Sequence, residues 1–445
     1  MSSSDLLSIG ASGARAYRAA MGAVSENITN ATTDGYNRRV VLLGESPASA
    51  VSSKFYKPGV SFGGVDVVAI VRKNDQYLDS AARVAAGNFE NADARATWLG
   101  NVQTALDDGQ LGVGQRLTTL FSAVERLASN PTDTTLRNNV LFSVDQVNTA
   151  FRQTGNDLAG VQTGIVTEAN NEAIALNDAV KRVASANEAL RRAIPGSSNE
   201  AQLLDQRDLA LTDISKRLNV TVTYGANGAA DVTYDGKKLV DNIVPHTFEV
   251  TASPTKTLSF SIEGQAVADP QSGSLAGLAT SADVATQRVN QVNTLAAQYV
   301  TDLNGWHQAG FTSDNRTNLA IVSGTDAASL QMLISDPADL AVKDSATGAL
   351  NGNLVKISAI RDTGGVENGW TAIISAHANL QNATNAEQKA AKTRQEQALA
   401  AQSDVSGVDL DREAADLMRL QQAYEGCARV LQVAKETIQS IMAIF

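Results

Sequence analysis

The segment from Asp409 to Phe445 constrains the fold more than any other part of the chain, because its large apolar residues recur every seven positions. This spacing is the a and d pattern of a helix that packs on another helix along a narrow seam. At 1.5 Å per residue the helix is on the order of 50 Å long, so only a second long helix can cover its seam. The a positions are Leu410, Leu417, Tyr424, Leu431, Ile438 and Phe445, and the d positions are Leu420, Cys427, Ala434 and Ile441, with Glu413 as the one polar interruption.

The first segment, from about Asp5 to Thr32, has a similar seven-residue repeat. Asp34 and Gly35 end it, the glycine providing the left-handed conformation usual just past a helix. Because each seam lacks a partner in an isolated helix, we expect both chain ends to be mobile in the isolated chain and to pack together as helices in an assembly. The repeat is carried by Leu7, Ala14, Met21 and Ile28, with Gly10, Tyr17, Val24 and Ala31 at the companion positions.

Two β-like runs follow the first helix, Arg38 to Leu43 and Val65 to Val71. The stretch between them contains Pro47, Pro58 and several glycines, which predicts a hairpin or an extended linker. Residues 1–72 are therefore interpreted as a terminal helix with its linker.

The rest of the chain alternates between helical and β-like patterns. Residues 73–218 and 273–404 are expected to be the two halves of a helical bundle, with a mixed α/β segment at 311–375. Residues 219–272 alternate apolar and polar side chains across glycine-rich turns, which predicts a small peripheral β domain. Residues 405–445 form the C-terminal helix. The expected fold class is mainly α with an inserted β domain, long terminal coiled-coil helices, and a central bundle formed by both halves of the chain.

The composition argues against nucleic-acid and membrane partners. The chain has 36 Lys and Arg against 47 Asp and Glu, a net charge of −11, so it lacks the basic surface that phosphate backbones select. No run reaches the roughly 18 apolar residues that a membrane span needs. The N-terminal residues do not resemble a cleaved secretion signal, and the single cysteine, Cys427, cannot form an intramolecular disulfide.

No residue pattern predicts catalysis, a metal or another cofactor. The three histidines, His246, His307 and His377, are far apart and belong to no recognisable ligand cluster. The acidic residues at 409–416 are interpreted as a solvated helix start that suits the positive end of the helix dipole, rather than as a cation site. We therefore expect a protein that is not an enzyme.

A basic group stands out in this acidic chain between positions 38 and 73. It is either an ordinary solvated face or a surface for an acidic partner, and the sequence leaves both possibilities open. The group consists of Arg38, Arg39, Lys54, Lys57, Arg72 and Lys73.

Several motifs resemble those of the bacterial flagellar axial protein family. The stretch NITNATTDGYNR at 27–38 is similar to the N-terminal signature of that family, with Asp34 where a proline is usual. The closing helix, with LQQAY at 420–424, resembles the matching C-terminal helix. The internal stretches LLDQRD at 203–208, GSLAGL at 273–278 and LNGWHQAGF at 303–311 narrow the resemblance to the hook-associated proteins of the hook–filament junction.

This resemblance implies a structural, extracellular protein of the flagellum, secreted through the flagellar type III export apparatus without a cleaved signal peptide. It implies a ring of subunits held by paired terminal helices. The implied partners are further copies of the chain, the hook protein, the second hook–filament junction protein and a dedicated cytosolic export chaperone at the C-terminal helix. Another axial protein of hook or filament type, or a surface adhesin acting through the β domain, remain alternatives. The expected assembly interface consists of Leu7, Tyr17, Met21, Val24, Ile28, Tyr36, Leu410, Leu417, Leu420, Tyr424, Leu431, Ile438 and Ile441.

Overall fold

The computed structural model describes residues 3–46, 63–106, 109–362 and 365–443. The chain divides into two compact units. Unit 1 comprises Met1–Asn88, Ile174–Phe248 and Lys392–Phe445, and unit 2 comprises Phe89–Ala173 and Glu249–Ala391. Three long helices contribute to both units, namely α2 (Gln76–Ala105), α4 (Thr134–Leu190) and α9 (Val366–Ser406).

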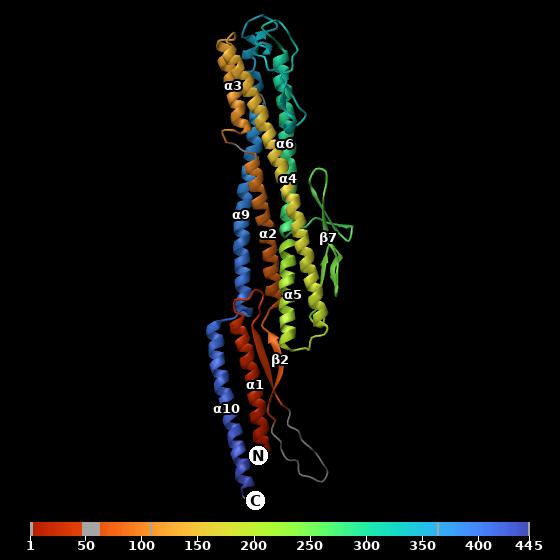
Figure 1. Cartoon of the computed structure of the whole chain (residues 1–445), viewed down its shortest axis with the longest axis vertical. Helices are drawn as coiled ribbons and strands as arrows, with labels where there is room; N and C mark the ends of the chain where they lie inside the picture. The colour runs from red at the N-terminus through yellow and green to blue at the C-terminus, as the bar shows by residue number, and fades with distance from the viewer. Residues whose placement is uncertain (1–2, 47–62, 107–108, 363–364, 444–445) are drawn as a thin grey trace. The chain divides into compact units, whose positions relative to one another are not determined.

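Unit 1 contains the two terminal helices, α1 (Ser3–Thr29) and α10 (Leu410–Met442), which run side by side in opposite directions (Figure 1). Gly10 lies against Leu431 and Gly13 against Cys427, so the two backbones approach closely. A methyl group on Gly13 would lie only 2.7 Å from the Cys427 sulfur. The helix that the C-terminal seam requires is therefore α1 of the same chain, which covers the part of the seam around Cys427 and Leu431.

A two-stranded antiparallel hairpin packs on α1. It consists of β1 (Arg39–Glu45) and β2 (Val65–Arg72), with Arg39 opposite Arg72 and a bulge between Leu42 and Leu43. The expected β-like runs thus pair as a hairpin. Next to β2 lies α5 (Ser198–Arg217), whose first turn is capped by the Ser197 hydroxyl accepting from the Glu200 amide at 3.2 Å.

A four-stranded antiparallel sheet completes unit 1. Its strands follow the order of the chain: β3 (Thr221–Tyr224), β4 (Ala230–Tyr234), β5 (Lys237–Asp241) and β6 (Val244–Pro245). The buried amide of Asn187 on α4 anchors this sheet, donating to the Ala230 carbonyl and accepting from the Ala230 N–H, both at 2.8 Å. Because both residues are fully buried, the sheet is bound to the helices by polar contacts as well as by apolar packing.

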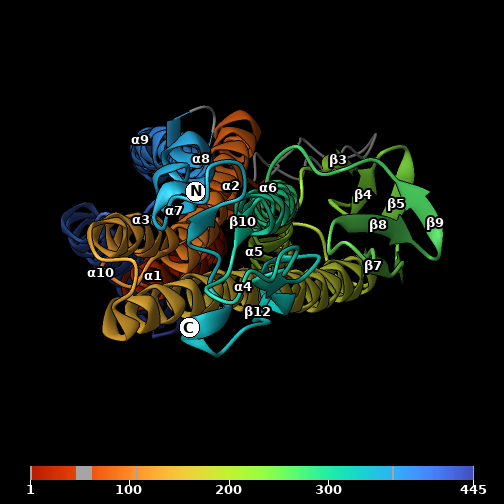
Figure 2. The same cartoon turned by 90° about the horizontal axis from the view of Figure 1, so that it is seen from above.

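Unit 2 is a helical bundle built from α3 (Val113–Ser129), α6 (Ser274–Gln308) and parts of α2, α4 and α9, and its long helices run lengthwise (Figures 1 and 2). Its core contains an aromatic cluster. The Phe151 ring from α4 lies 5.6 Å from the Tyr299 ring of α6 and 6.4 Å from the Trp370 ring of α9. The two halves of the chain therefore meet in one core, as the sequence predicts.

The remaining strands are short. A three-stranded sheet contains β7 (Phe248–Ala252), β8 (Leu258–Ile262) and β9 (Gln265–Val267). The segment at 310–362 contains two small strand pairs and short helices. The pairs are β10 (Gly310–Phe311) with β13 (Lys343–Asp344) and β11 (Val322–Ser323) with β12 (Gln331–Met332), and the short helices are η1 (Ala327–Ser329), η2 (Pro337–Asp339), α7 (Gly352–Val355) and α8 (Ser358–Asp362).

The boundaries differ from expectation in two places. The strands at 221–267 lie inside the expected insert of 219–272, but they form two sheets, and only β3 to β6 lie wholly in unit 1. Helix α9 begins at Val366, inside the expected mixed segment of 311–375, and Trp370 in its first turns is buried in the bundle.

Candidate assembly interface

The amide of Asn27 is the centre of the contact between the chain ends. Asn27 is fully buried near the end of α1, and its Oδ1 accepts from the Arg39 N–H and from the Tyr36 hydroxyl, both at 2.8 Å. Its Nδ2 donates to the Arg39 carbonyl and to Oε2 of Glu413 on α10, both at 2.9 Å. Burial raises the pKa of Tyr36 to about 12, so the hydroxyl keeps the proton that it donates. One amide thus closes the turn after α1 and joins it to the C-terminal helix.

Glu413 receives a second contact, from Arg38. The Arg38 Nε lies 2.5 Å from Glu413 Oε1, and its NH2 group lies 3.3 Å from Asp416. The Glu413 side chain has an exposed fraction of 0%, and that of Asp416 has 28%. The d position that breaks the apolar repeat is therefore occupied by a buried, paired carboxylate. We call Asn27, Tyr36, Arg38 and Glu413 the polar latch.

The polar latch continues into a second group of ion pairs that joins the hairpin to α5. Arg72 on β2 lies 2.8 Å from Asp205 and 2.9 Å from Asp208. Arg39 on β1 lies 2.6 Å from Glu26 on α1 and 3.5 Å from Asp205. Two arginines of the hairpin therefore share the Asp205 carboxylate, which stands in the LLDQRD motif.

This arrangement answers the question left open by the basic group. Arg38, Arg39 and Arg72 pair with carboxylates of their own chain, so they form neither a solvated face nor a surface for an acidic partner. Lys73 is exposed, while Lys54 and Lys57 lie outside the described residues. The expectation of a fully solvated acidic helix start is likewise wrong for Glu413. It is right for Asp409, which caps α10 by accepting from the Asp411 and Arg412 amides.

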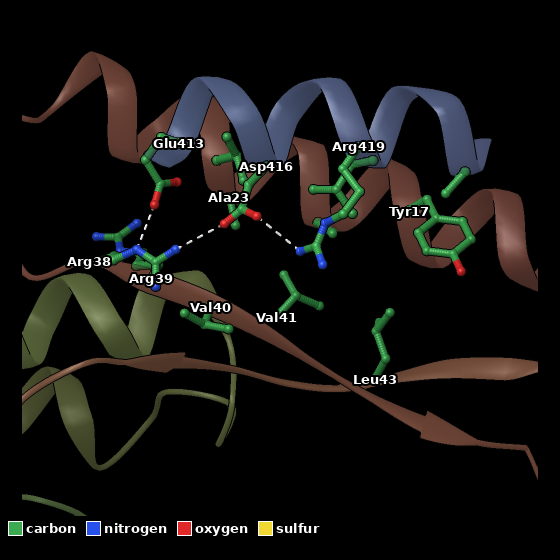
Figure 3. Close-up of a pocket in the computed structure, with 14 residues that line it drawn as sticks. Tyr17, Ala23, Arg38, Arg39, Val40, Val41, Leu43, Glu413, Asp416 and Arg419 are labelled. Carbon is green, nitrogen blue, oxygen red and sulfur yellow. Dashed lines mark hydrogen bonds and ion pairs between the residues drawn. The ribbon is translucent and has the colours of Figure 1, made fainter. Parts of the chain in front are cut away.

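A groove of about 380 Å³ lies between α1, β1 and α10 (Figure 3). Its apolar walls come from all three elements. The charged part of its lining consists of Arg38, Arg39, Glu413, Asp416 and Arg419. In Figure 3, Asp416 lies between Arg38 and Arg419, with which it pairs at 3.3 Å and 3.0 Å. The apolar lining consists of Tyr17, Ala20, Ala23, Val24, Val40, Val41, Leu43, Leu420 and Ala423.

The structure places the expected interface residues in three settings. Val24 is buried, and Leu431 packs on Gly10 within the α1–α10 contact. A second set is half-buried: Leu7, Tyr17, Met21, Ile28, Tyr36, Leu417, Leu420 and Ile438. A third set on α10 is exposed to solvent: Leu410, Tyr424 and Ile441.

The buried face of α1 is richer in small residues than the sequence pattern predicts. The buried small residues stand one position before members of the predicted seven-residue repeat. They are Gly13, Ala16, Ala20 and Ala23. Their spacing of three and four was the available signal. Asn27 is the first residue of the NITNATTDGYNR motif, but nothing in its sequence context shows that its amide is buried.

The two buried histidines are hydrogen-bonded rather than poised for chemistry. In unit 2, His307 Nδ1 lies 2.7 Å from the Leu319 carbonyl, and its Nε2 accepts from the Ala341 N–H at 3.0 Å. His377 Nε2 lies 2.9 Å from the Leu99 carbonyl. Burial lowers the pKa of both imidazoles. Within the described ranges, no three His, Cys, Asp or Glu side chains are grouped so as to hold a metal ion.

None of the described helices has both the length and the apolar character that a membrane span needs. The fold and the site together define a mainly helical protein whose two terminal helices pair and are joined by buried polar contacts.

Two models of known protein families match parts of this chain. A model of the flagellar hook-associated protein FlgK helical domain matches residues 99–322, and a model of the C-terminal region of flagellar basal body rod FlgEFG proteins matches residues 403–444. The chain belongs to the flagellar hook-associated protein FlgK family.

Two sequence relatives agree with this assignment. The chain is 24% identical over 325 residues to flagellar hook-associated protein 1 of Salmonella typhimurium, and the aligned region covers 70% of this chain and 58% of that relative. It is 22% identical over 485 residues to flagellar hook-associated protein 1 of Bacillus subtilis, covering 96% and 95% of the two chains. A solved structure of the flagellar hook junction protein FlgK from Burkholderia pseudomallei aligns with a TM-score of 0.49 and 20% identity, over 54% of this chain and 46% of that one. The chain thus spans little more than half the length of the Salmonella relative.

Proposed function

We propose that this chain is a structural, non-catalytic subunit of the junction between the hook and the filament of a bacterial flagellum. The observation that carries the proposal is the α1–α10 pair, in which one face is closed by the polar latch while large apolar residues of α10 stay exposed. Exposed apolar residues on a long helix favour burial against another protein surface. Membership in the FlgK family and the names of the relatives support the same role.

In this proposal the subunits form a ring, and the exposed positions Leu410, Tyr424 and Ile441 are buried between neighbouring copies. The hook protein contacts one side of the ring and the second junction protein the other. Before export through the flagellar type III apparatus, a cytosolic chaperone covers the same exposed face of α10. The assembled protein is extracellular.

Electron microscopy of cells that lack this chain tests the role. We expect hooks without filaments and flagellin released into the medium. Complementation with the wild-type chain should restore filaments, whereas Tyr424→Glu should not, because it introduces a charge where the proposal buries an aromatic ring. Gln422→Glu is the matched control, since Gln422 is also exposed on α10 and is outside the expected interface.

Normal filaments in the deletion strain would overturn the junction role. Full complementation by Tyr424→Glu would retain the role but remove Tyr424 from the interface. The purified variants should have the helical circular dichroism and the melting temperature of the wild type, because neither side chain is buried in the isolated chain.

A further inference from the structure

Arg137, in the first turn of α4 in unit 2, is a buried cation whose hydrogen-bond partners are all uncharged. Its exposed fraction is 6%. Its Nε donates to the Pro131 carbonyl at 2.8 Å, and its Nη1 donates to the Ser313 hydroxyl at 2.7 Å and to the Pro337 carbonyl at 3.3 Å. The Nη2 group has no partner among the described residues, so its two N–H groups remain available to a ligand.

A second cation of unit 2, Lys343 on β13, reaches the same loop. Its Nζ donates to the Ser313 carbonyl at 2.7 Å and to Oδ1 of Asn315 at 3.1 Å, which are again uncharged acceptors. An ammonium group has three N–H donors, so one of them remains available. Arg137 and Lys343 therefore approach Ser313 from two different elements, and neither forms an ion pair within the part of the chain that the structure describes.

The carboxylates of this region lie on a different arginine. Arg316, whose side chain has an exposed fraction of 48%, pairs with Asp339 and lies 3.7 Å from Asp314. An exposed ion pair contributes only about 0–1 kcal/mol, whereas burying a charge without a counter-charge is costly. Burial accordingly lowers the pKa of Arg137. The carboxylates therefore offset the exposed cation, and the buried cation is left without a counter-charge from the described residues.

The loop that carries Ser313 is held in one conformation by its own hydrogen bonds. The Thr312 N–H donates to the Arg316 carbonyl at 2.9 Å, and the Arg316 N–H donates to the buried Thr312 hydroxyl at 3.0 Å. Asn315 has a φ of 60°, a left-handed conformation that asparagine adopts more readily than most residues. The two cations are thus positioned before a ligand binds, which reduces the entropy cost of binding.

We propose that Arg137 and Lys343 form, beside Ser313, a binding site for a doubly charged oxyanion of the phosphate class. The Nη2 group of Arg137 and the remaining N–H of Lys343 donate to the oxygens of the anion, and the two positive charges match its two negative charges. A carboxylate has one negative charge and would leave one cation without a counter-charge. The same dianionic group is present in free phosphate and in a phosphomonoester.

Calorimetric titration of the full-length chain tests the site with inorganic phosphate. At about pH 8, where phosphate carries close to two negative charges, and at constant ionic strength, we expect one saturable site per chain. Acetate should bind at least about tenfold more weakly, because it has a single charge. A parallel titration with O-phosphoserine distinguishes the sources: tighter binding than that of phosphate indicates a phosphomonoester, and weaker binding indicates the free anion. The absence of saturable phosphate binding, or equal binding of acetate, would overturn the inference.

Substitutions assign the site to its residues. Lys343→Gln should weaken phosphate binding about tenfold, because it removes one charge-assisted hydrogen bond while a glutamine amide still reaches the loop. Arg316→Gln is the matched control, since it removes one positive charge from the same loop at an arginine that already has carboxylate partners. It should bind phosphate like the wild type. Unchanged binding by Lys343→Gln, or an equal loss in Arg316→Gln, would contradict the two-cation site.

Arg137→Lys tests the buried member, because it keeps the charge and removes Nη2. Phosphate binding should weaken about tenfold or more. A variant that is destabilised is recognised by its melting temperature, and hydrogen exchange on the wild-type chain then gives an independent answer. Saturating phosphate should slow amide exchange at 312–318 and 336–343 and leave unit 1 unchanged. Protection only in other segments would overturn the inference. The deletion strain tests the junction role separately, so that role does not depend on these results.

Discussion

Replacing Glu413 by glutamine should weaken the docking of α10 on α1 more than its small change in volume implies. Both carboxylate oxygens of Glu413 accept hydrogen bonds, Oε1 from Arg38 and Oε2 from Asn27. A glutamine amide has only one oxygen, so in either orientation its NH2 group faces a donor. One buried donor is therefore left without an acceptor, and the charge-assisted contact with Arg38 is weakened.

The magnitude follows from the burial of the two partners. Removing one member of a buried ion pair costs about 3–5 kcal/mol, because the other charge is left uncompensated. Arg38 keeps Asp416 at 3.3 Å, which reduces the loss. We therefore expect Glu413→Gln to make the docking of α10 on α1 less favourable by about 2–4 kcal/mol. Asp416→Asn, the matched control, removes a longer and partly exposed contact and should cost about 0.5–1 kcal/mol.

Hydrogen exchange on the purified chain measures this loss directly, because opening of α10 exposes its amides without global unfolding. Glu413→Gln should accelerate exchange over residues 410–423 and in the turn at 30–38, and should leave the bundle of unit 2 unchanged. Equal effects of Glu413→Gln and Asp416→Asn would refute the reasoning, because the polar latch would then contribute no more than a surface pair. Fast exchange of α10 in the wild-type chain would also refute it, and would agree with the expectation that the chain ends are mobile before assembly.

Three further outcomes follow from the structure. Gly13→Ala should destabilise the α1–α10 contact by about 1–3 kcal/mol in urea unfolding, and Cys427→Ala should rescue it, because the clash is with the sulfur at 2.7 Å while the Cys427 Cβ would lie 3.8 Å away; a failed rescue would contradict the packing described. Burial lowers the pKa of His307 and His377, so below about pH 6.5 these two imidazoles bind fewer protons in the folded chain than in the unfolded chain. Their contribution to the free energy of unfolding should therefore be complete above about pH 6.5 and should be lost as the pH falls through the lowered pKa values. The slope of the free energy of unfolding against pH approaches about 1.4 kcal/mol per pH unit for each histidine. His377→Gln should reduce this slope in urea unfolding at pH 5 to 8, and an unchanged slope would show that His377 does not contribute to the pH dependence. Asn187→Leu should cost about 1–3 kcal/mol for each of the two Ala230 backbone groups that it leaves unpaired, and a thermal melt like that of the wild type would show that the sheet is not anchored there.

Local periodicity along the chain was sufficient to predict the main helices and strands. The heptads at both ends predict α1 and α10, and alternating residues with glycine turns predict the strands at 221–267, because side-chain periods of seven and two follow directly from helix and strand geometry. The motif residues were also identified from the sequence, including Asn27, Tyr36 and LLDQRD at 203–208.

The roles of those residues depend on contacts that form when the chain folds. Glu413 interrupts an apolar repeat, and Arg38 and Arg72 belong to a basic group, so each has the sequence signature of a solvated side chain. The fold brings together four segments that are up to 386 positions apart, and the buried charges then neutralise one another. A sequence pattern reports which face of an element is apolar, but the cost of burying a charge depends on which partner from another segment lies within about 3 Å of it. That partner is set by the three-dimensional packing alone, which is why the polar latch could not be predicted from the sequence.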